Sequence, residues 1–558
     1  MSIGGPRPTG RSDAEVIVVG GGHNGLITAA YLARAGIDTL LVEARAAVGG
    51  CAATVSDLGA RFNVCHCDHT LIRATPIADE LELARHGLHY LEPPTGNVHL
   101  FHDGSPPWVQ FHEPEAMLEG LARTHPAQVD GYRRYLDDAL PVAELVLAML
   151  TTPPTTARMA RTVADRRAVG AARLLDWSRR SATAVLRRYF DDWRFITPAA
   201  SLGPTVWGVS PDRVGTGMAA LAYATRHLVR SGRPVGGSGA LTDAVRSCLV
   251  AAGGRVRAGA RVDELTVADG GVTGVRLDDG TELRSSVVVA ATDPRTVLVQ
   301  WLTAPPPAAR RLVERWRATP VPEGYESKLD AVLTRPPRFA ALGELEREFP
   351  GVDFLAATTV VNPHPTDLAI AHSRRERGQV APRPTLLVNA PTVLDPTMAP
   401  GPGRHVLSLE VLFTPYHHPG GWPDSPEPAR WLEVWGALAE PGFADSVDRW
   451  RVMTPDRYER EFLLGRGHPP AYAAHPLATL IGRRPELSRY RTPITGLYLS
   501  GAGTYPGAGV SGAPGRNAAA AVLADLQTPR RRTARARRLC SRAGGGVPLR
   551  PGDRSPAP

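Results

Sequence analysis

Three glycines near the start of the chain have the spacing that binds a dinucleotide. Gly20, Gly22 and Gly25 form a G-x-G-x-x-G pattern, and Glu43 follows 23 residues after the first glycine. Glycine lets the backbone turn sharply and approach a diphosphate, while a helix that begins at such a turn offers free N–H donors to the phosphates. A carboxylate in this place accepts both hydrogen bonds of a ribose diol and repels a 2′-phosphate. The pattern therefore predicts a dinucleotide other than NADP.

The elements around these residues are those of a βαβ unit. Residues 16–19, with the sequence VIVV, are expected to form a buried strand, and residues 26–35 a helix that ends before Gly36. Residues 37–42 are expected to form a second strand that ends at the acid. A lone glycine motif is weak, but a strand, a helix and a terminal acid around it make the prediction specific.

A second pair of glycines bears on the choice between FAD and NAD. In "EARAAVGGC", Gly49 and Gly50 lie six and seven residues beyond Glu43. This stretch resembles the FAD-containing amine oxidases and phytoene desaturases, in which a loop that ends in Gly-Gly passes against the flavin diphosphate and ring. An NAD-only domain has no need of this pair. The resemblance implies FAD as the cofactor.

Three later stretches carry the same resemblance. Residues 234–265 are similar to the segment that re-enters the FAD domain, residues 283–294 to its returning strand, and residues 494–526 to the C-terminal flavin motif. The match is to the phytoene desaturase and carotenoid isomerase branch, and within it to flavoproteins of the pyridine nucleotide-disulfide oxidoreductase domain 2 type. The motifs together imply these cofactor-binding residues: Gly20, Gly22, Asn24, Gly25, Glu43, Ala44, Arg45, Gly49, Gly50, Val262, Gly501, Gly509 and Val510.

One lysine is a candidate for chemistry at the flavin. Lysine and arginine total 64, and Lys328 is the single lysine among them. A position that keeps lysine in such a chain is expected to need a compact, titratable ammonium, which arginine cannot supply. Alternation in "SKLDAV" places Lys328 and Asp330 on one face of a strand. Some relatives hold a water near flavin N5 with a lysine on a similar strand, and a chance surface lysine is the alternative.

Two further residues are catalytic candidates. Residues 65–69, Cys-His-Cys-Asp-His, are too crowded for a usual zinc site and have no second ligand pair, so no metal is expected. This segment is either a loop that lines the substrate cavity, with His69 as acid or base, or ordinary packing. Tyr505 adjoins the C-terminal flavin motif and is expected to border the substrate.

The fold class that these motifs predict is α/β, with an FAD-binding Rossmann-like domain of the amine oxidase and phytoene desaturase type and an interleaved α+β substrate domain. A chain of 558 residues is too long for one core. The FAD-binding domain is expected to comprise residues 13–90, 234–300 and 470–528. The substrate domain is expected to comprise residues 91–233 and 301–469. The termini, 1–12 and 529–558, are expected to be disordered.

Charge is concentrated in a few segments. The formal net charge is +9, and nine arginines against one aspartate in residues 530–558 account for +8 of it, which leaves +1 for the rest. No nucleic-acid partner is therefore expected. The tail is either a solvated extension or a contact for a polyanion such as an acidic lipid. Residues 158–190, with nine arginines, form either a solvated helical face over the core or a pair of amphipathic helices on an anionic membrane.

The cellular setting follows from what the sequence lacks. It has no signal peptide and no unbroken apolar run long enough to cross a bilayer, and its five cysteines include no C-x-x-C. A cytoplasmic protein is therefore expected, with the inner face of the membrane as an alternative. The excess of arginine over lysine is typical of a GC-rich genome, so a bacterial source is expected.

The sequence thus predicts an FAD-dependent oxidoreductase. It is expected to remove two hydrogens from a C–C or C–N bond of an apolar organic substrate by hydride transfer to flavin N5. Oxygen, a quinone or another acceptor would then reoxidise the cofactor. Two alternatives remain open at this point, namely a flavin-dependent double-bond isomerase or saturase, and a non-catalytic FAD-bound regulatory or interaction protein.

Overall fold

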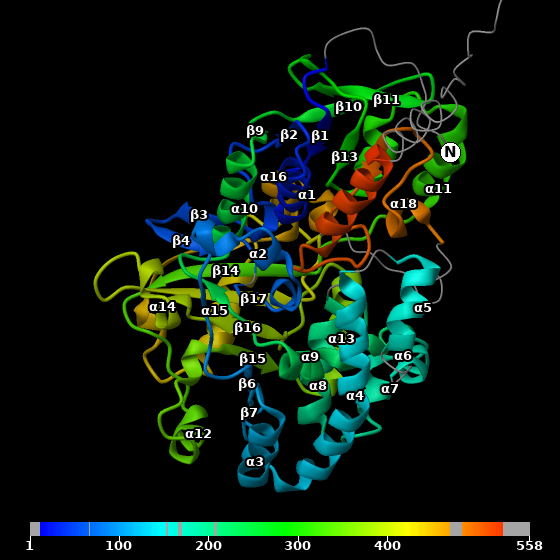
Figure 1. Ribbon diagram of the computed structural model, residues 1–558. Helices are drawn as coiled ribbons and strands as arrows, with labels where there is room; N and C mark the ends of the chain where they lie inside the picture. Colours follow the sequence, from blue (N-terminus) through cyan, green and yellow to red (C-terminus); the bar gives the residue numbers. More distant parts are fainter. Residues whose placement is uncertain are drawn as a thin grey trace, which may run out of the picture.

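A five-stranded parallel sheet and a seven-stranded mixed sheet organise the molecule (Figure 1). The structure is a computed structural model, and it describes residues 12–65, 67–151, 154–165, 170–205, 209–468 and 483–527. Several residues named in the sequence analysis lie outside the described ones, namely His66 and residues 470–482. The termini expected to be disordered also lie outside them, apart from Ser12.

The parallel sheet has the order β19-β13-β1-β2-β9, which is the doubly wound arrangement that the sequence predicts. Its four strands other than the edge strand β9 are short, apolar and buried, as expected where helices cover a parallel sheet. They come from distant parts of the chain: β1 (Val16–Val19), β2 (Thr39–Val42), β9 (Arg255–Arg257), β13 (Val288–Ala290) and β19 (Leu497–Leu499).

Helices α1 (His23–Arg34) and α10 (Gly239–Ala251) pack against each other on this sheet, and a helix over 513–527 contacts α1 through Gly515 and Asn24. An antiparallel meander follows β9: β10 (Val262–Ala268), β11 (Gly271–Leu277) and β12 (Glu282–Arg284). The predicted βαβ unit is confirmed, although α1 begins at His23, three residues earlier than expected.

The second sheet has the order β18-β14-β17-β16-β15-β6-β7. β6 and β7 form a hairpin around Asp103-Gly104, and the stretches "ESKLDAVLTRP" and "HVLSLEVLF" contain β14 and β17. The strands are β6 (Asn97–Phe101), β7 (Trp108–Gln110), β14 (Glu326–Leu333), β15 (Thr358–Asn362), β16 (Leu386–Asn389), β17 (His405–Leu412) and β18 (Val447–Met453).

The two faces of this sheet differ in character. One face is apolar and packs in a core of its own that includes Leu329, Ala331, Leu409 and Val411. The other face meets the hairpin of β3 (Thr54–Asp57) and β4 (Ala60–Asn63) near its β14 edge. Towards β6 it is covered by three helices whose aromatic residues form the largest core, namely α4 (Val129–Leu150), α8 (Trp193–Thr205) and α9 (Ala222–Leu228) (Figure 1).

The arginine-rich segment 158–190 does not form the pair of helices with a free apolar face that membrane contact would need. It contains three helices, α5 (Thr156–Asp165), α6 (Ala171–Trp177) and α7 (Ala182–Leu186). Their larger apolar residues, including Trp177 and Leu186, are buried in the helical core. Arg180 and Arg188 pair with Asp176 on the outside. The described part of this segment thus covers the core with its larger apolar residues inside, which favours the solvated-face interpretation, and contact with an anionic membrane stays a prediction.

Within the described ranges, no helix combines the length and the apolarity that a membrane span requires.

Candidate active site

The glycine turn is built so that one side of it stays open. Gly20 has φ +104°, and a Cβ added there would lie 3.0 Å from the Ala291 carbonyl oxygen. A Cβ on Gly25 would lie 1.9 Å from the carbonyl oxygen of Gly20, so α1 can pack on β1 only without a side chain there. By contrast, a Cβ on Gly22 would meet nothing within 4 Å. Gly20 and Gly25 therefore shape the turn, and Gly22 leaves the approach that a diphosphate needs.

The acid and the second glycine pair lie against this turn. Glu43 accepts hydrogen bonds from the backbone N–H groups of Gly21 (2.5 Å) and Arg45 (2.8 Å). The N–H of Gly49 donates to the Gly21 carbonyl oxygen at 2.8 Å, and Gly22 and Gly49 form a parallel bridge. Residues separated by more than twenty positions thus form one small surface.

The C-terminal glycines close the same surface. Gly501 has φ +89° and adjoins Ala291, which also borders Gly20. His23 hydrogen-bonds to the backbone of Gly509, and burial lowers the pKa of its imidazole to about 4. Val510 packs beside the core around α1. The structure therefore brings the cofactor-binding candidates of the first and last segments together.

Val262 and Ala44 lie in the wall next to this surface. Val262 begins β10 and is 4% exposed, while Ala44 is partly buried between Glu43 and Arg45. The Glu43 carbonyl oxygen accepts a hydrogen bond from the N–H of Ala260, and the Arg45 carbonyl oxygen accepts one from the N–H of Gly259. These bonds fix the loop after β2 to the start of the meander.

The surface fits a dinucleotide on chemical grounds. No side chain caps the N-terminus of α1, and its first turn holds no acid. Among the described residues, four buried polar atoms around the turn lack a hydrogen-bond partner: Nε2 of His23, Oδ1 of Asn24, Nη1 of Arg45 and Oγ1 of Thr292. Buried polar atoms are normally satisfied, so these atoms indicate a polar ligand. FAD would supply an anionic diphosphate to the helix N-terminus and ribose hydroxyls to Glu43.

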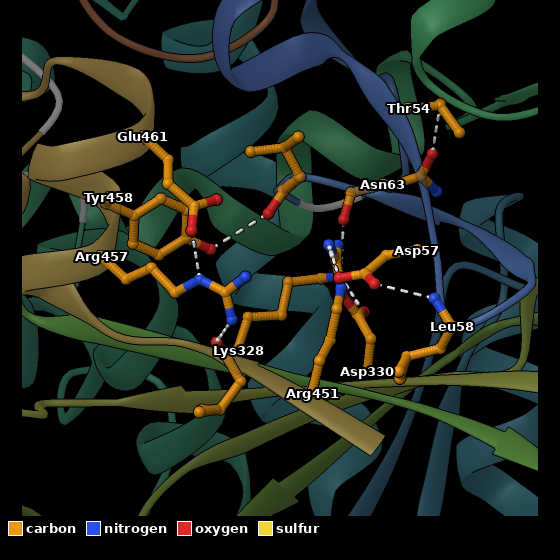
Figure 2. A network of polar contacts seen from close by, with 12 residues as sticks. Thr54, Asp57, Leu58, Asn63, Lys328, Asp330, Arg451, Arg457, Tyr458 and Glu461 are labelled. Atoms are coloured by element: carbon orange, nitrogen blue, oxygen red, sulfur yellow. Dashed lines mark hydrogen bonds and ion pairs between the residues drawn. The ribbon is translucent and has the colours of Figure 1, made fainter. Parts of the chain in front are cut away.

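Lys328 lies between the two sheets. Its Nζ donates to the Asn63 carbonyl oxygen at 2.7 Å and forms an ion pair with Asp330 (Figure 2). The second carboxylate oxygen of Asp330 accepts from Arg451 at 3.0 Å, and Arg451 also reaches Asp57 at 3.3 Å. Lys328 is 1% exposed. The prediction that Lys328 and Asp330 share a strand face is confirmed, and the chance surface lysine is excluded.

A buried polar row crosses the whole seven-stranded sheet on this face. Side chains that are opposite each other on neighbouring strands project to the same face, so the register identifies the row. Cross-strand pairing and one side-chain contact connect Arg451, Asp330, Ser408, Asn389, Thr358, Asn97 and Gln110, one from each strand, and all are buried. Polar residues in such a row are costly in a core, so a functional surface is indicated.

Two carboxylic acids next to Lys328 have unusual environments. Glu410 lies directly opposite Lys328 on β17, is 7% exposed, and its Oε1 has no hydrogen-bond partner among the described residues. Burial, with the neighbouring Glu326, raises the pKa of Glu410 to about 8 against the opposing effect of Lys328. Burial also raises the pKa of Glu326 to about 7. Such carboxyl groups can exchange protons near neutral pH.

His69 and Tyr505 lie elsewhere around this region. The imidazole of His69 is 1% exposed and is held by the hydroxyl groups of Ser238 (2.6 Å) and Tyr90 (3.1 Å). Tyr505 donates from its hydroxyl group to the Met149 carbonyl oxygen at 2.9 Å, at the end of α4. Both side chains thus hold segments together. In the described residues, no group of three or more His, Cys, Asp or Glu side chains is placed to hold a metal ion.

Sequence reasoning missed several residues of this face. Asp68 is paired with Arg233 at 2.6 Å and accepts a hydrogen bond from Thr358, which links the loop after β4 to the sheet. Arg233 also donates to Asn389 at 2.6 Å. One signal could have identified Glu410. It lies in the strand "HVLSLEVLF", whose other residues are mostly apolar, so burial is expected for this glutamate as well.

The chain is similar over most of its length to several known proteins. The sequence profile of flavin-containing amine oxidoreductases matches residues 25–325. Mouse pyridine nucleotide-disulfide oxidoreductase domain-containing protein 2 is 30% identical over 93% of this chain and 94% of its own length. One component of the limonene dehydrogenase of Castellaniella defragrans is 27% identical over 92% and 95%. The lycopene-forming phytoene desaturase of Pantoea ananas is 27% identical over 91% and 98%.

A solved structure supports the fold independently. Putrescine oxidase bound to putrescine superposes with a TM-score of 0.58 at 18% identity, covering 92% of this chain and 99% of that chain. The predicted fold class is therefore confirmed, and the cofactor is FAD, as the family indicates, while the glycine turn has the geometry that a dinucleotide needs.

Adding a methyl group at Gly25 should abolish tight cofactor binding. The new Cβ of Gly25→Ala would clash with the Gly20 carbonyl oxygen and displace α1 from the turn. We expect FAD affinity to fall by more than about tenfold, measured by titrating FAD into the deflavinated protein. Gly343→Ala is the matched control, because a Cβ there meets nothing within 4 Å. Equal affinities for the two variants would contradict the proposed site.

The two raised pKa values make stability depend on pH. A carboxyl group with a raised pKa in the folded state stabilises fully below its unfolded pKa of 4.5, and this contribution is lost as the pH rises through about 7 for Glu326 and about 8 for Glu410. We expect the Tm of the wild type to fall from pH 5 to pH 9, because the free energy of unfolding decreases by up to roughly 1.4 kcal/mol per pH unit for each group.

Glu410→Gln should flatten this dependence, because the amide does not titrate. The exposed Glu346→Gln variant serves as control and should follow the wild type. Parallel Tm profiles for the wild type and Glu410→Gln would show that Glu410 does not titrate in a buried setting.

Proposed function

We propose a dehydrogenase function for this chain, which belongs to the family of flavin-containing amine oxidoreductases. It is an FAD-dependent oxidoreductase, and the proposed reaction removes two hydrogens from an organic substrate held between the cofactor and the polar face of the seven-stranded sheet. The observation that carries the proposal is the placement of Lys328 and Glu410. They are buried and opposite each other on β14 and β17, on the face that meets the β3–β4 hairpin.

Each group has a part in this reaction. Bound FAD supplies a two-electron acceptor for a hydride. Removal of a hydride and a proton from adjacent atoms leaves a double bond, and Glu410 accepts the proton on its unpartnered Oε1. Lys328 holds a positive charge at the site, and its hydrogen bonds to Asn63 and Asp330 fix its Nζ in place. Oxygen, a quinone or another acceptor completes the cycle.

The relatives favour a carbon–carbon bond as the site of reaction. A component of a limonene dehydrogenase and a lycopene-forming phytoene desaturase both align with more than nine-tenths of the chain. Apolar residues line the covered part of the sheet face beyond Glu410, among them Leu387 and Val360. Both observations support an apolar organic substrate and a desaturation. His69 and Tyr505 then serve as positioning residues, through Ser238 and Met149 respectively.

Anaerobic mixing with terpenes and polyenes tests the reaction. We expect one member of the panel, which includes limonene and phytoene, to bleach the flavin and to yield a product with one more double bond. A change of double-bond geometry without bleaching would contradict dehydrogenation in favour of isomerisation. Flavin that no member of the panel reduces would also count against the proposal.

Two substitutions test the proposed roles. Glu410→Gln should slow flavin reduction about a hundredfold and remove the rise in rate that the wild type shows as pH passes through about 8, because only the carboxylate accepts a proton. Lys328→Met should slow flavin reduction or reoxidation by a similar factor, whereas Glu346→Gln should change neither rate. Rates within twofold of the wild type for both variants, measured by stopped-flow absorbance, would exclude these residues from catalysis.

A further inference from the structure

A second group of buried side chains on the same sheet face lacks partners. His99, Asn97 and Gln110 on β6 and β7 are 0%, 1% and 1% exposed. In the described ranges, neither ring nitrogen of His99 has a hydrogen-bond partner, and Oδ1 of Asn97 and Oε1 of Gln110 have none. A buried polar atom is normally satisfied by the chain, by water or by a ligand. The unpartnered nitrogens of His99 therefore indicate a polar group that the described residues do not provide, whereas the Asn97 and Gln110 oxygens can only accept a hydrogen bond.

A guanidinium group from α9 faces this group. Nη1 of Arg226 is buried and has no hydrogen-bond partner among the described residues, while the side chain as a whole is partly exposed. Burial lowers the pKa of Arg226, and Asp68 is the acid that acts against this effect. Asp68 is already bound by Arg233 and Thr358. The buried, unpartnered nitrogen of this guanidinium therefore offers hydrogen-bond donors and positive charge to an anion.

Contacts along α9 place Arg226 near His99. The Tyr223 carbonyl oxygen accepts from Nε2 of Gln110 at 3.0 Å, and the Tyr223 and His99 rings meet edge to face with centroids 6.3 Å apart. Arg226 follows Tyr223 by three residues, so both project from the same side of the helix. The charge of Arg226 also lowers the pKa of the buried His99, which keeps its imidazole neutral.

The register relates this group to the reactive residues. One transverse row of the sheet runs from Lys328 through Glu410, Leu387 and Val360 to His99. Glu410 and His99 are therefore three strand spacings apart, which amounts to about 14 Å. The residues between them are apolar, and the aromatic core of α4, α8 and α9 covers this part of the face.

We propose that Arg226 binds a carboxylate at one end of an elongated substrate, with His99 as a second donor. A carboxylate matches the guanidinium in charge and in planar geometry. The apolar part of the substrate then spans Val360 and Leu387 and reaches Glu410. This inference rests on the proposed function, because the anion belongs to the molecule that is dehydrogenated. It specifies the substrate class as an apolar chain that ends in a carboxylate.

Binding of decanoate to the FAD-loaded protein tests the inference by calorimetry. We expect decanoate to bind at least tenfold more tightly than decanamide and than acetate, because the site needs both the anion and the apolar chain. Arg226→Gln should weaken decanoate binding at least tenfold and leave decanamide unchanged. The control is Arg230→Gln, because Arg230 is half exposed and paired with Glu113 and Glu92. It should bind decanoate as the wild type does.

The stability of a second variant separates a binding role from a structural one. Arg226→Met removes the donors of the proposed site, so decanoate should raise the Tm of the wild type and leave that of the variant unchanged. A rise in Tm with decanoate that persists in Arg226→Met would overturn the inference. So would decanoate that binds no better than decanamide, or equally to the wild type and Arg226→Gln.

These outcomes are distinct from failure of the proposed function. Decanoate bound through Arg226 by a protein whose flavin no substrate reduces would support the anion site and contradict the dehydrogenase. A flavin reduced by an uncharged terpene, without decanoate binding, would support the dehydrogenase and overturn the carboxylate site.

Discussion

A buried ammonium group joins the two sheets of this protein. Lys328 can remain charged inside the core because the Asn63 carbonyl oxygen and the Asp330 carboxylate satisfy it, and Arg451 balances the second oxygen of Asp330. Removing one member of such a network leaves the others uncompensated. Because Asn63 belongs to the β3–β4 hairpin and Asp330 to β14, the network fixes the polar face of the seven-stranded sheet against the dinucleotide-binding part of the chain.

The same sheet face carries both the residues proposed for proton transfer and those proposed to bind the anion. The register that places Lys328 opposite Glu410 also places Thr358 opposite Asn97 and Val360 opposite His99. The proposed proton acceptor and the proposed anion site thus lie on one sheet, whose backbone hydrogen bonds fix their relative positions. Strands hold side chains more rigidly than loops do, which suits a reaction that needs defined positions.

The local parts of this arrangement could be predicted from the sequence, and the non-local parts could not. The turn at Gly20 to Gly25, the acid at Glu43 and the shared face of Lys328 and Asp330 depend on neighbours within one βαβ unit or one strand. The positions of Glu410 and Arg226 depend on the strand order and on how α9 covers the sheet, which no local pattern contains. For residues 158–190, arginine content alone could not decide which side the apolar residues face, and burial of Trp177 decided it.

The most direct test is a pH titration of the visible spectrum of the bound flavin, which needs no substrate. A carboxyl group that titrates beside the cofactor changes the local charge and hence the absorbance. The account predicts a spectral transition near pH 8 in the wild type, the pKa of Glu410, and its loss in Glu410→Gln. A spectrum that stays constant across this range, or a transition that persists unchanged in the variant, would contradict the placement of this sheet face at the flavin.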